Sequence, residues 1–280
     1  MQLPSTTTLL LRVEHHACYI TFNRPRYRNA MNRAMAQELL QVFDWLTRAQ
    51  EIRALVLRGA GSTFSSGADL RELAELSKPE SVRPVGPSKN ASSDGAIADH
   101  NRTLGLVCRS AAELDIPIVA AIEGAALGTG LGLACISDIV LAVQGAIFGL
   151  PETRLGLVPA HIAPFAVERI GAPATRRLAL TGARFDADAA VPLGLVDQVY
   201  DTTHEMEQAL HQILAQVVSC EPAANRATKR LLRRLGPIVS DNLLDHAAHV
   251  YSSHVLSPSG REGVAAFLAH REPNFKPQDT

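Results

Sequence analysis

The sequence predicts an α/β protein, and three observations lead to that fold class. Short apolar runs of strand length alternate with segments of helical period through most of the 280 residues. A unit of strand, glycine-containing loop and helix occurs twice, with Gly67 and Gly128 in the two loops. After Tyr200 every segment has a helical pattern. Alternation of this kind places strands side by side in one sheet, and 46% hydrophobic residues provide for a sizeable core.

The elements before the first glycine loop follow from apolar spacing. Two runs of strand composition flank the His15-His16 pair and predict a hairpin. A helical pattern and a short buried strand come next. The expected hairpin strands, helix and buried strand cover residues 8–13, 17–22, 29–49 and 54–59.

The middle of the chain repeats this order. A helix is expected from about Ala68. Residues 77–98 are rich in Pro, Ser and Gly without an apolar period, which predicts a mobile surface loop, a candidate flap over a site. One helix and three strands should then occupy residues 98–114, 117–122, 138–143 and 146–152, with a further helix from about Gly130.

The last part differs in character. Four helices are expected, broken at Pro222 and Pro237. We therefore divide the chain into an α/β core, residues 1–200, and a helical region, residues 201–280. The four helices should cover residues 203–219, 222–235, 240–255 and 259–270.

Composition excludes several classes of protein. A net charge of −1, with no basic stripe with interleaved aromatic residues, argues against nucleic acid as a partner. The four cysteines have no metal-ligand spacing and favour reduced thiols, and the N-terminus has no signal-peptide pattern, so we expect a cytoplasmic enzyme without a metal. Glu123, Asp138 and Pro151 interrupt the apolar stretch 117–150, which argues against a membrane span.

The stretch "GAALGTGLGLACISD" (124–138) has more glycine than a buried helix or strand tolerates well. Two loops that each lead into a helix could aim two backbone N–H groups at one oxygen, which is an oxyanion hole. The alternative is that the glycines only allow close packing of helix on strand. Gly128, Gly130 and Gly132 do not match G-x-G-x-x-G, and no Gly-Lys-Ser/Thr follows, so a phosphate loop is excluded.

Six segments together resemble the enoyl-CoA hydratase/isomerase (crotonase) superfamily. They are "FNRPRYRNAMN", "FSSGADL", "PIVAAIEGAALGTGLGLACISDIVLA", "FGLPETRLGLVPA", "LTGARFDADAAVPLGLVDQV" and "EGVAAFLAHREPNF". The resemblance implies a spiral of ββα units followed by a helical trimerisation region, hence a homotrimer or a dimer of trimers. It implies an acyl-CoA thioester as substrate and no other cofactor.

The resemblance also assigns the oxyanion donors. By position they are the backbone N–H groups of Ala68, after Gly67, and Thr129, after Gly128. Family members usually have glycine where this chain has Thr129. A backbone donor tolerates threonine there if the local φ and ψ suit it.

Hydratases of this family use two glutamates, and this chain retains one. Glu152 in "LPETRLG" matches the first, whereas Gly132 stands where the second is expected. Burial of Glu152 should raise its pKa toward neutrality. One carboxylate suffices for a Δ3,Δ2-enoyl-CoA isomerase, while hydration ordinarily needs a second group for the water. Asp69 and Asp138 are expected to have structural roles.

The stretch "RLGLVPAHIAPFAVERIG" (154–171) points toward hydration. It resembles bacterial isohexenylglutaconyl-CoA and methylglutaconyl-CoA hydratases, whose substrates have an additional carboxylate. That carboxylate, or His161, could position the water, although a loop histidine bonded to backbone is the alternative. Arg154 could pair with Glu152 or with the substrate carboxylate.

The resemblance finally places the CoA-binding residues. Phe267 matches an aromatic residue that packs on CoA from a neighbouring subunit, followed by His270 where a basic residue is common. Surface arginines without a ligand are the alternative for the basic positions. A hydratase is preferred, with an isomerase and an inactive acyl-CoA-binding protein as alternatives. The residues expected beside the nucleotide and the pantetheine are Arg26, Tyr27, Arg28, Ala68, Asp69 and Leu70.

Overall fold

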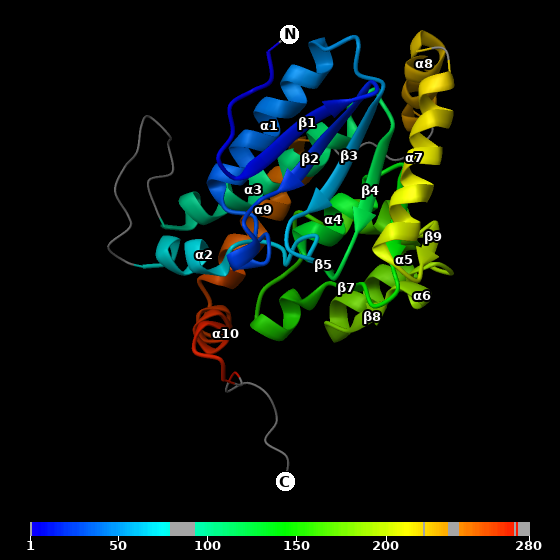
Figure 1. Cartoon of the computed structure of the whole chain (residues 1–280). Coiled ribbons are helices and arrows are strands. Elements are labelled where there is room, and N and C mark those ends of the chain that lie inside the picture. The colour runs from blue at the N-terminus through cyan, green and yellow to red at the C-terminus, as the bar shows by residue number, and fades with distance from the viewer. Residues whose placement is uncertain (1, 79–92, 221, 235–240, 272, 274–280) are drawn as a thin grey trace.

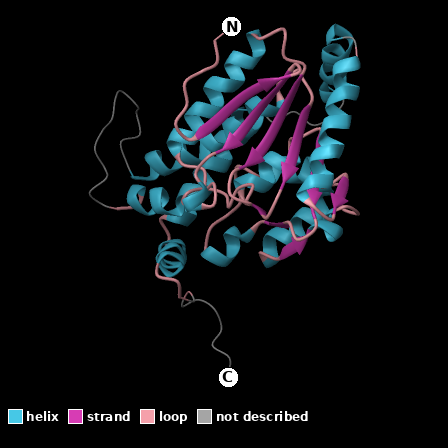
Figure 2. Ribbon diagram, in the orientation of Figure 1, coloured by secondary structure: helices cyan, strands magenta, loops and turns pink. Residues whose placement is uncertain are grey.

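A six-stranded sheet organises the molecule (Figures 1 and 2). The computed structural model describes residues 2–78, 93–220, 222–234, 241–271 and 273. All neighbouring strands are parallel except the first pair, a hairpin in which His15 and His16 have φ of 46° and 65°. The strands, in spatial order, are β1 (Leu9–Glu14), β2 (Ala17–Phe22), β3 (Ala54–Gly59), β4 (Ile118–Ile122), β6 (Ile139–Val143) and β9 (Gln198–Tyr200).

Residues on the central strands alternate between two apolar layers. Leu55 and Leu57 face the larger layer, and Ala54 and Val56 face the smaller one. Burial on both faces explains why these strands are continuous apolar runs rather than alternating patterns. The larger layer is covered by α1 (Arg33–Arg48), α3 (Ser93–Ala112), α4 (Thr129–Cys135) and α5 (Ala163–Thr181).

The smaller layer includes a helix from the region after Tyr200. Helix α7 (Thr203–Ser219) buries Met206 and Leu210 against this face of the sheet. A helix of the expected helical region 201–280 thus contributes to the core, and the division of the chain at residue 200 stays a prediction. Composition could not show this, because an amphipathic helix has the same pattern whether it packs on a sheet or on other helices.

A second, three-stranded sheet lies at the ends of the parallel strands. Its strands are β5 (Ala125–Leu127), β7 (Ile147–Gly149) and β8 (Arg184–Asp186). β5 and β7 are parallel, and β8 runs antiparallel to β7. The short strand expected at 146–152 is thus present as β7, and β5 lies immediately before Gly128.

The expected loop at 77–98 is only partly a loop. Helix α2 (Leu70–Leu76) ends just before it, and α3 begins at Ser93, earlier than the expected Ala98. Ile97 is fully buried with Leu73 and Tyr251, which stabilises the first turns of α3. Residues 79–92 lie outside the described part of the chain, so their expected mobility stays a prediction.

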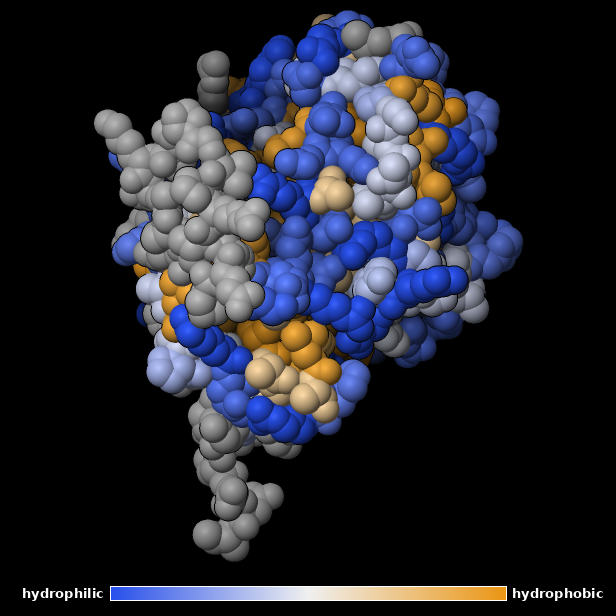
Figure 3. Space-filling view, turned by 90° about the vertical axis from the view of Figure 1, so that its left-hand side faces the viewer, coloured by the Kyte–Doolittle hydropathy of each residue, from blue (hydrophilic) through white to orange (hydrophobic). Residues whose placement is uncertain are grey.

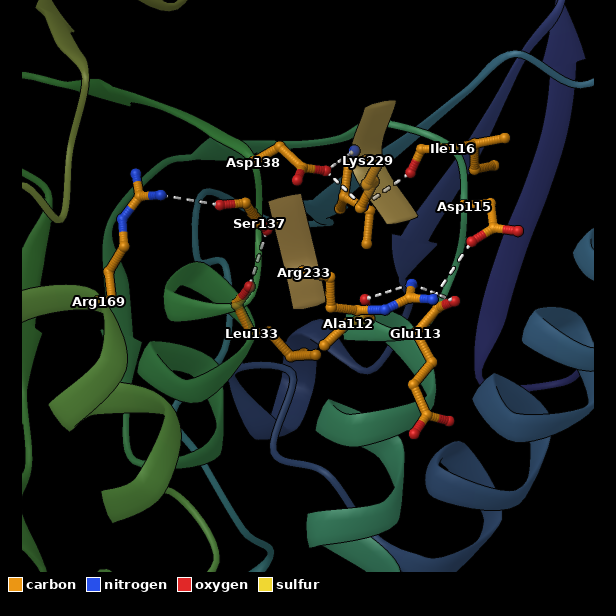
Figure 4. A network of polar contacts seen from close by, with 11 residues as sticks. Ala112, Glu113, Asp115, Ile116, Leu133, Ser137, Asp138, Arg169, Lys229 and Arg233 are labelled. Atoms are coloured by element: carbon orange, nitrogen blue, oxygen red, sulfur yellow. Dashed lines mark hydrogen bonds and ion pairs between the residues drawn. The ribbon is translucent and has the colours of Figure 1, made fainter. Parts of the chain in front are cut away.

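The C-terminal helices pack on their own chain. Besides α7, they are α8 (Pro222–Arg234), α9 (Asp241–Val255) and α10 (Pro258–Leu268). α9 lies along α3, and α10 contacts α2. Lys229 of α8 donates to the Ile116 carbonyl and to Asp138, whose carboxylate also accepts from the Ile118 N–H (Figure 4). The structural role expected of Asp138 is confirmed.

Two further observations concern composition. Cys18, Cys108 and Cys135 are buried free thiols, and Cys220 is an exposed one. Within the described ranges, no helix is long and apolar enough to cross a membrane, and no three His, Cys, Asp or Glu residues are grouped to hold a metal.

Candidate active site

The two glycine loops meet at the carboxyl ends of β3 and β4. Ser65 donates its N–H to the Ala125 carbonyl at 2.9 Å, and Leu127 donates back to the Ser65 carbonyl at 2.9 Å. A Cβ added to Gly67 would lie 2.9 Å from the Leu127 carbonyl oxygen and 3.4 Å from the Gly128 Cα. The loops are therefore fixed against each other by backbone contacts.

The structure brings Ala68 and Thr129 to this junction. Among the described residues, neither main-chain N–H donates a hydrogen bond. Thr129 is the first residue of α4, so its N–H lacks an intrahelical acceptor. Two unpaired N–H groups on adjoining loops can bind one anionic oxygen.

The glycines of this stretch have two different structural roles. Gly128 has φ of 53° and ψ of −121°, a conformation that residues with a Cβ avoid. Gly130 allows close packing, because a Cβ there would lie 2.6 Å from the Ser65 carbonyl oxygen. Backbone shape and helix packing thus require different glycines of the same stretch.

Glu152 lies beside this junction. It belongs to the 3-10 helix η3 (Pro151–Leu155), and a Cβ on Gly128 would lie 2.8 Å from its Oε1 atom. Its Oε2 atom is buried without a hydrogen-bond partner in the described part of the chain. Burial raises the pKa of Glu152 to about 7, partly offset by a hydrogen bond from its own backbone. The expected upward shift is confirmed, and the group exchanges protons near neutral pH.

Gly132 faces apolar neighbours, not an open polar space. A Cβ at this position would lie 3.3 Å from the Cys108 Sγ and 3.3 Å from the Ile162 Cγ2. A glutamate would have to displace these groups. On this side of the junction, the polar contacts come from His161.

His161 is buried and bonded to side chains, which differs from the expected backbone-bonded loop histidine. Its Nε2 lies 2.9 Å from the Thr129 Oγ1, and its Nδ1 lies 2.7 Å from the Asn101 Nδ2. Burial, together with His100, lowers the pKa of His161 to about 3, so the ring is neutral. The ring also packs edge-on against Tyr251, with centroids 6.2 Å apart.

Sequence reasoning missed Asn101, His100 and Tyr251. Asn101 did offer a signal, since it lies on the apolar face of α3 with Leu104 and Cys108. A polar residue on the buried face of a helix needs a partner. Tyr251, from α9, is recognisable only once the helices are placed.

A cleft of about 720 Å³ opens beside the junction. Leu127 and Pro151 line the cleft, and they are next to Gly128 and Glu152 in the chain. Figure 3 shows a face of the molecule on which hydrophilic surface is interrupted by several separate apolar patches. The residues expected beside the nucleotide and the pantetheine line the cleft, as does Phe267; they are Arg26, Tyr27, Arg28, Ala68, Asp69 and Leu70. The other expected binding residues, Gly67, Gly128, Gly130 and His161, are not among the lining residues.

Two arginines lie against the ring of Tyr27, which lines the cleft. Tyr27 is 45% exposed, and the guanidinium groups of Arg24 and Arg71 lie 4.7 and 5.1 Å from its ring centroid. Asp69 accepts from Arg24 at 2.9 Å and caps α2 by accepting from the Arg71 N–H at 3.1 Å. Asp69 thus has the structural role expected of it while also lining the cleft.

Phe267 and Arg154 both line the cleft. Phe267 does so from α10, which packs on η3 of the same chain, and its expected contact with CoA bound to a neighbouring subunit stays a prediction. Arg154 does not pair with Glu152. It donates from Nε to the Thr181 carbonyl at 3.2 Å and lines the cleft.

Comparisons with known proteins identify the family of the chain. The profile of the enoyl-CoA hydratase/isomerase family matches residues 12–278. The 2,3-dehydroadipyl-CoA hydratase of Escherichia coli (strain K12) is 29% identical over 269 residues, 96% of this chain and 98% of the relative. The 1,2-epoxyphenylacetyl-CoA isomerase of the same organism is 31% identical over 269 residues, with 95% and 97% coverage.

A solved structure shows which fold the chain has. Pseudomonas aeruginosa AtuE is 42% identical, covers 95% of this chain and 98% of its own, and superposes with a TM-score of 0.76. The ββα architecture is thus of the crotonase type. With nearly the whole chain matched, the protein belongs to the enoyl-CoA hydratase/isomerase family of acyl-CoA enzymes.

Proposed function

We propose that the protein is an enoyl-CoA hydratase in which Glu152 is the single acid–base carboxylate. The N–H groups of Ala68 and Thr129 bind the thioester carbonyl oxygen. The observation that supports this most directly is the position of Glu152, whose Oε1 lies against Gly128 while Oε2 is unpartnered among the described residues. A carboxyl group beside unpaired N–H donors can move a proton at the carbon next to a thioester carbonyl.

A single carboxylate can carry out both proton transfers of the hydration. Ionised Glu152 removes a proton from water as the water oxygen bonds to C3. The electrons of the C2–C3 double bond shift to the carbonyl oxygen, and the two N–H groups stabilise the enolate. Protonated Glu152 then donates its proton to C2, which restores the carboxylate. A pKa of about 7 suits a group that must both accept and donate.

The cleft would hold coenzyme A. Arg26 and Arg28 line it beside Tyr27, and guanidinium groups bind phosphates in bidentate geometry. The pantetheine would pass Asp69 and Leu70 to reach Ala68 and the junction. No further cofactor enters the proposal.

For the acyl group we propose a branched substrate of the glutaconyl type. Support comes from the resemblance of residues 154–171 and from Arg154, which lines the cleft and is not used by Glu152. The test compares 3-methylglutaconyl-CoA with crotonyl-CoA. A lower KM for the carboxylated substrate is expected, and equal or weaker binding of it would remove this part of the proposal.

The isomerase is the second candidate, favoured by the apolar contacts around Gly132. Purified protein and its Glu152→Gln variant are incubated with 2-enoyl, 3-enoyl and 3-methylglutaconyl thioesters of CoA, and products are resolved by mass. Water gain that the variant loses supports the hydratase. Double-bond migration without water gain selects the isomerase, and tight CoA binding without turnover selects an acyl-CoA-binding protein.

Assembly and location belong to the same proposal. Exposed Leu231 and Leu232 on α8 are 60% and 61% accessible in the single chain, and this apolar surface supports self-association. From the family resemblance we propose a homotrimer or a dimer of trimers in the cytoplasm. Size-exclusion chromatography with light scattering measures the mass of the assembly. A monomer at micromolar concentration would contradict it.

A further inference from the structure

Three buried side chains from separate elements form a chain of hydrogen bonds that ends at the candidate oxyanion hole. Asn101 from α3, His161 before α5 and Thr129 at the start of α4 are 0%, 3% and 0% exposed. The links are 2.7 Å from Asn101 to His161 and 2.9 Å from His161 to Thr129. Buried polar groups at such distances hold one another in a defined orientation.

The atoms that face one another fix the direction of donation. Asn101 presents Nδ2, a donor, to the His161 Nδ1, which therefore accepts. A neutral ring then has its proton on Nε2 and donates it to the Thr129 Oγ1. The hydroxyl hydrogen of Thr129 has no acceptor in the described ranges, so it remains available for a ligand.

A second observation indicates that something polar binds here. The Asn101 Oδ1 is buried without a partner among the described residues, as are the His100 Nε2 and the Glu152 Oε2. His100 lies close enough to His161 to influence its pKa, and Glu152 likewise influences Tyr251, whose ring packs on His161. Buried polar atoms that lie near one another without protein partners indicate that water or a ligand binds between them.

The chain of hydrogen bonds lies on the face of α4 where a carboxylate is absent. Thr129 and Gly132 are three residues apart, so they lie on the same face of the helix. Ile162 covers Gly132, while the preceding residue, His161, contacts Thr129. Thr129 is therefore the polar position of this face next to Gly128 and Glu152.

We propose that Asn101 and His161 are positioning residues that orient the Thr129 hydroxyl to donate a hydrogen bond to the water attacking C3. This inference rests on the proposed hydratase activity. The water gives its proton to Glu152, one oxygen lone pair bonds to C3, and the other accepts from Thr129. The imidazole stays neutral and transfers no proton.

The test separates water positioning from the oxyanion hole. Exchange of the C2 hydrogen of a saturated acyl-CoA in D2O needs Glu152 and the two N–H groups but no water at C3. Hydration of an enoyl-CoA needs Glu152, the two N–H groups and also the positioned water at C3. Thr129→Val removes the hydroxyl and retains the N–H, and Thr129→Ser retains both.

We expect Thr129→Val and His161→Leu to lower kcat for hydration roughly 10–100-fold, the effect of one positioned donor. C2 exchange by His161→Leu, which leaves Glu152 and both N–H donors in place, should stay within about threefold of wild type, and Thr129→Ser should hydrate faster than Thr129→Val. His161→Gln, which offers an amide donor to Thr129, should restore part of the hydration rate. The double variant Thr129→Val/His161→Leu should be no slower than Thr129→Val alone, because both substitutions remove the same hydrogen bond to the water.

Parallel loss of hydration and exchange would make the cluster structural and overturn the inference. Retained hydration in Thr129→Val would also overturn it. If the wild-type protein hydrates no enoyl-CoA, or Glu152→Gln hydrates normally, the proposed function itself fails. Thermal unfolding of each variant identifies any that lose the fold, and for those the Thr129→Ser and His161→Gln pair decides.

Discussion

Glu152 and Gly128 occupy one site in a way that permits no side chain at residue 128. The Oε1 atom lies where a Cβ on Gly128 would approach to 2.8 Å, and Gly128 has φ of 53°. The carboxyl group is thereby held against the loop that carries the Thr129 N–H. The acid–base group and the candidate oxyanion donor are parts of one packed unit, not independent features.

Gly128→Ala is expected to lower hydration at least 100-fold, because the new Cβ displaces the Glu152 carboxyl from the reacting carbon. Backbone strain should also lower the free energy of unfolding by about 1–3 kcal/mol. Gly145→Ala is the matched control, since Gly145 has φ of 88° and no atom within 4 Å of an added Cβ. Equal losses of activity in the two variants would contradict the role of the Glu152 contact.

The pH dependence of hydration should report Glu152. The carboxyl group must be ionised to accept a proton from water, and its pKa is about 7. We therefore expect kcat/KM to rise tenfold per pH unit below 7 and to level off above 8. His161, with a pKa near 3, contributes no ionisation in this range. A rate that is flat from pH 5 to 9 would contradict this assignment.

Glu152 should make the protein less stable as the pH rises. Its pKa is about 7 in the folded protein, above the ordinary 4.5, so between these values the folded state retains a proton that the unfolded state has lost. The resulting cost grows through this window and reaches about 3 kcal/mol above pH 7. Glu152→Gln removes the ionisation.

Urea unfolding of wild type and Glu152→Gln tests the sign. The variant should be more stable than wild type at pH 8, and the difference should largely vanish at pH 4.5. A difference that is the same at both pH values would show that packing of the amide, and not ionisation, decides the stability.

Arg26 should contribute to binding of the nucleotide part of CoA. Its side chain lines the cleft beside Tyr27 and is exposed in the unliganded protein. Arg26→Gln is expected to raise KM for a CoA thioester roughly 3–10-fold through loss of a phosphate contact, with kcat unchanged. The N-acetylcysteamine thioester of the same acyl group lacks the phosphates and should show no change. An equal rise for both substrates would place Arg26 elsewhere.

The sequence predicted the bounds of an element well where the spacing of apolar residues within that segment determines which of its residues are buried. The strands at 17–22 and 54–59 and the helix at 203–219 have the expected bounds. The early start of α3 was missed, because Ile97 is a single apolar residue whose burial depends on Leu73 and Tyr251 from other elements. The short strands β5, β8 and β9 also escaped prediction, since pairing across the molecule defines them, and helix α5 was not predicted either.

For the site, the sequence alone determined the family, the glycine loops and Glu152, since these are contiguous motifs whose chemistry can be read from residue type and spacing. The tertiary structure decided how they act together. It placed the Glu152 carboxyl against Gly128, filled the space at Gly132 with Cys108 and Ile162, and joined Asn101 to Thr129 through His161. Residues 101, 129 and 161 have no local pattern in common, because a hydrogen bond between distant segments depends on packing and not on spacing along the chain.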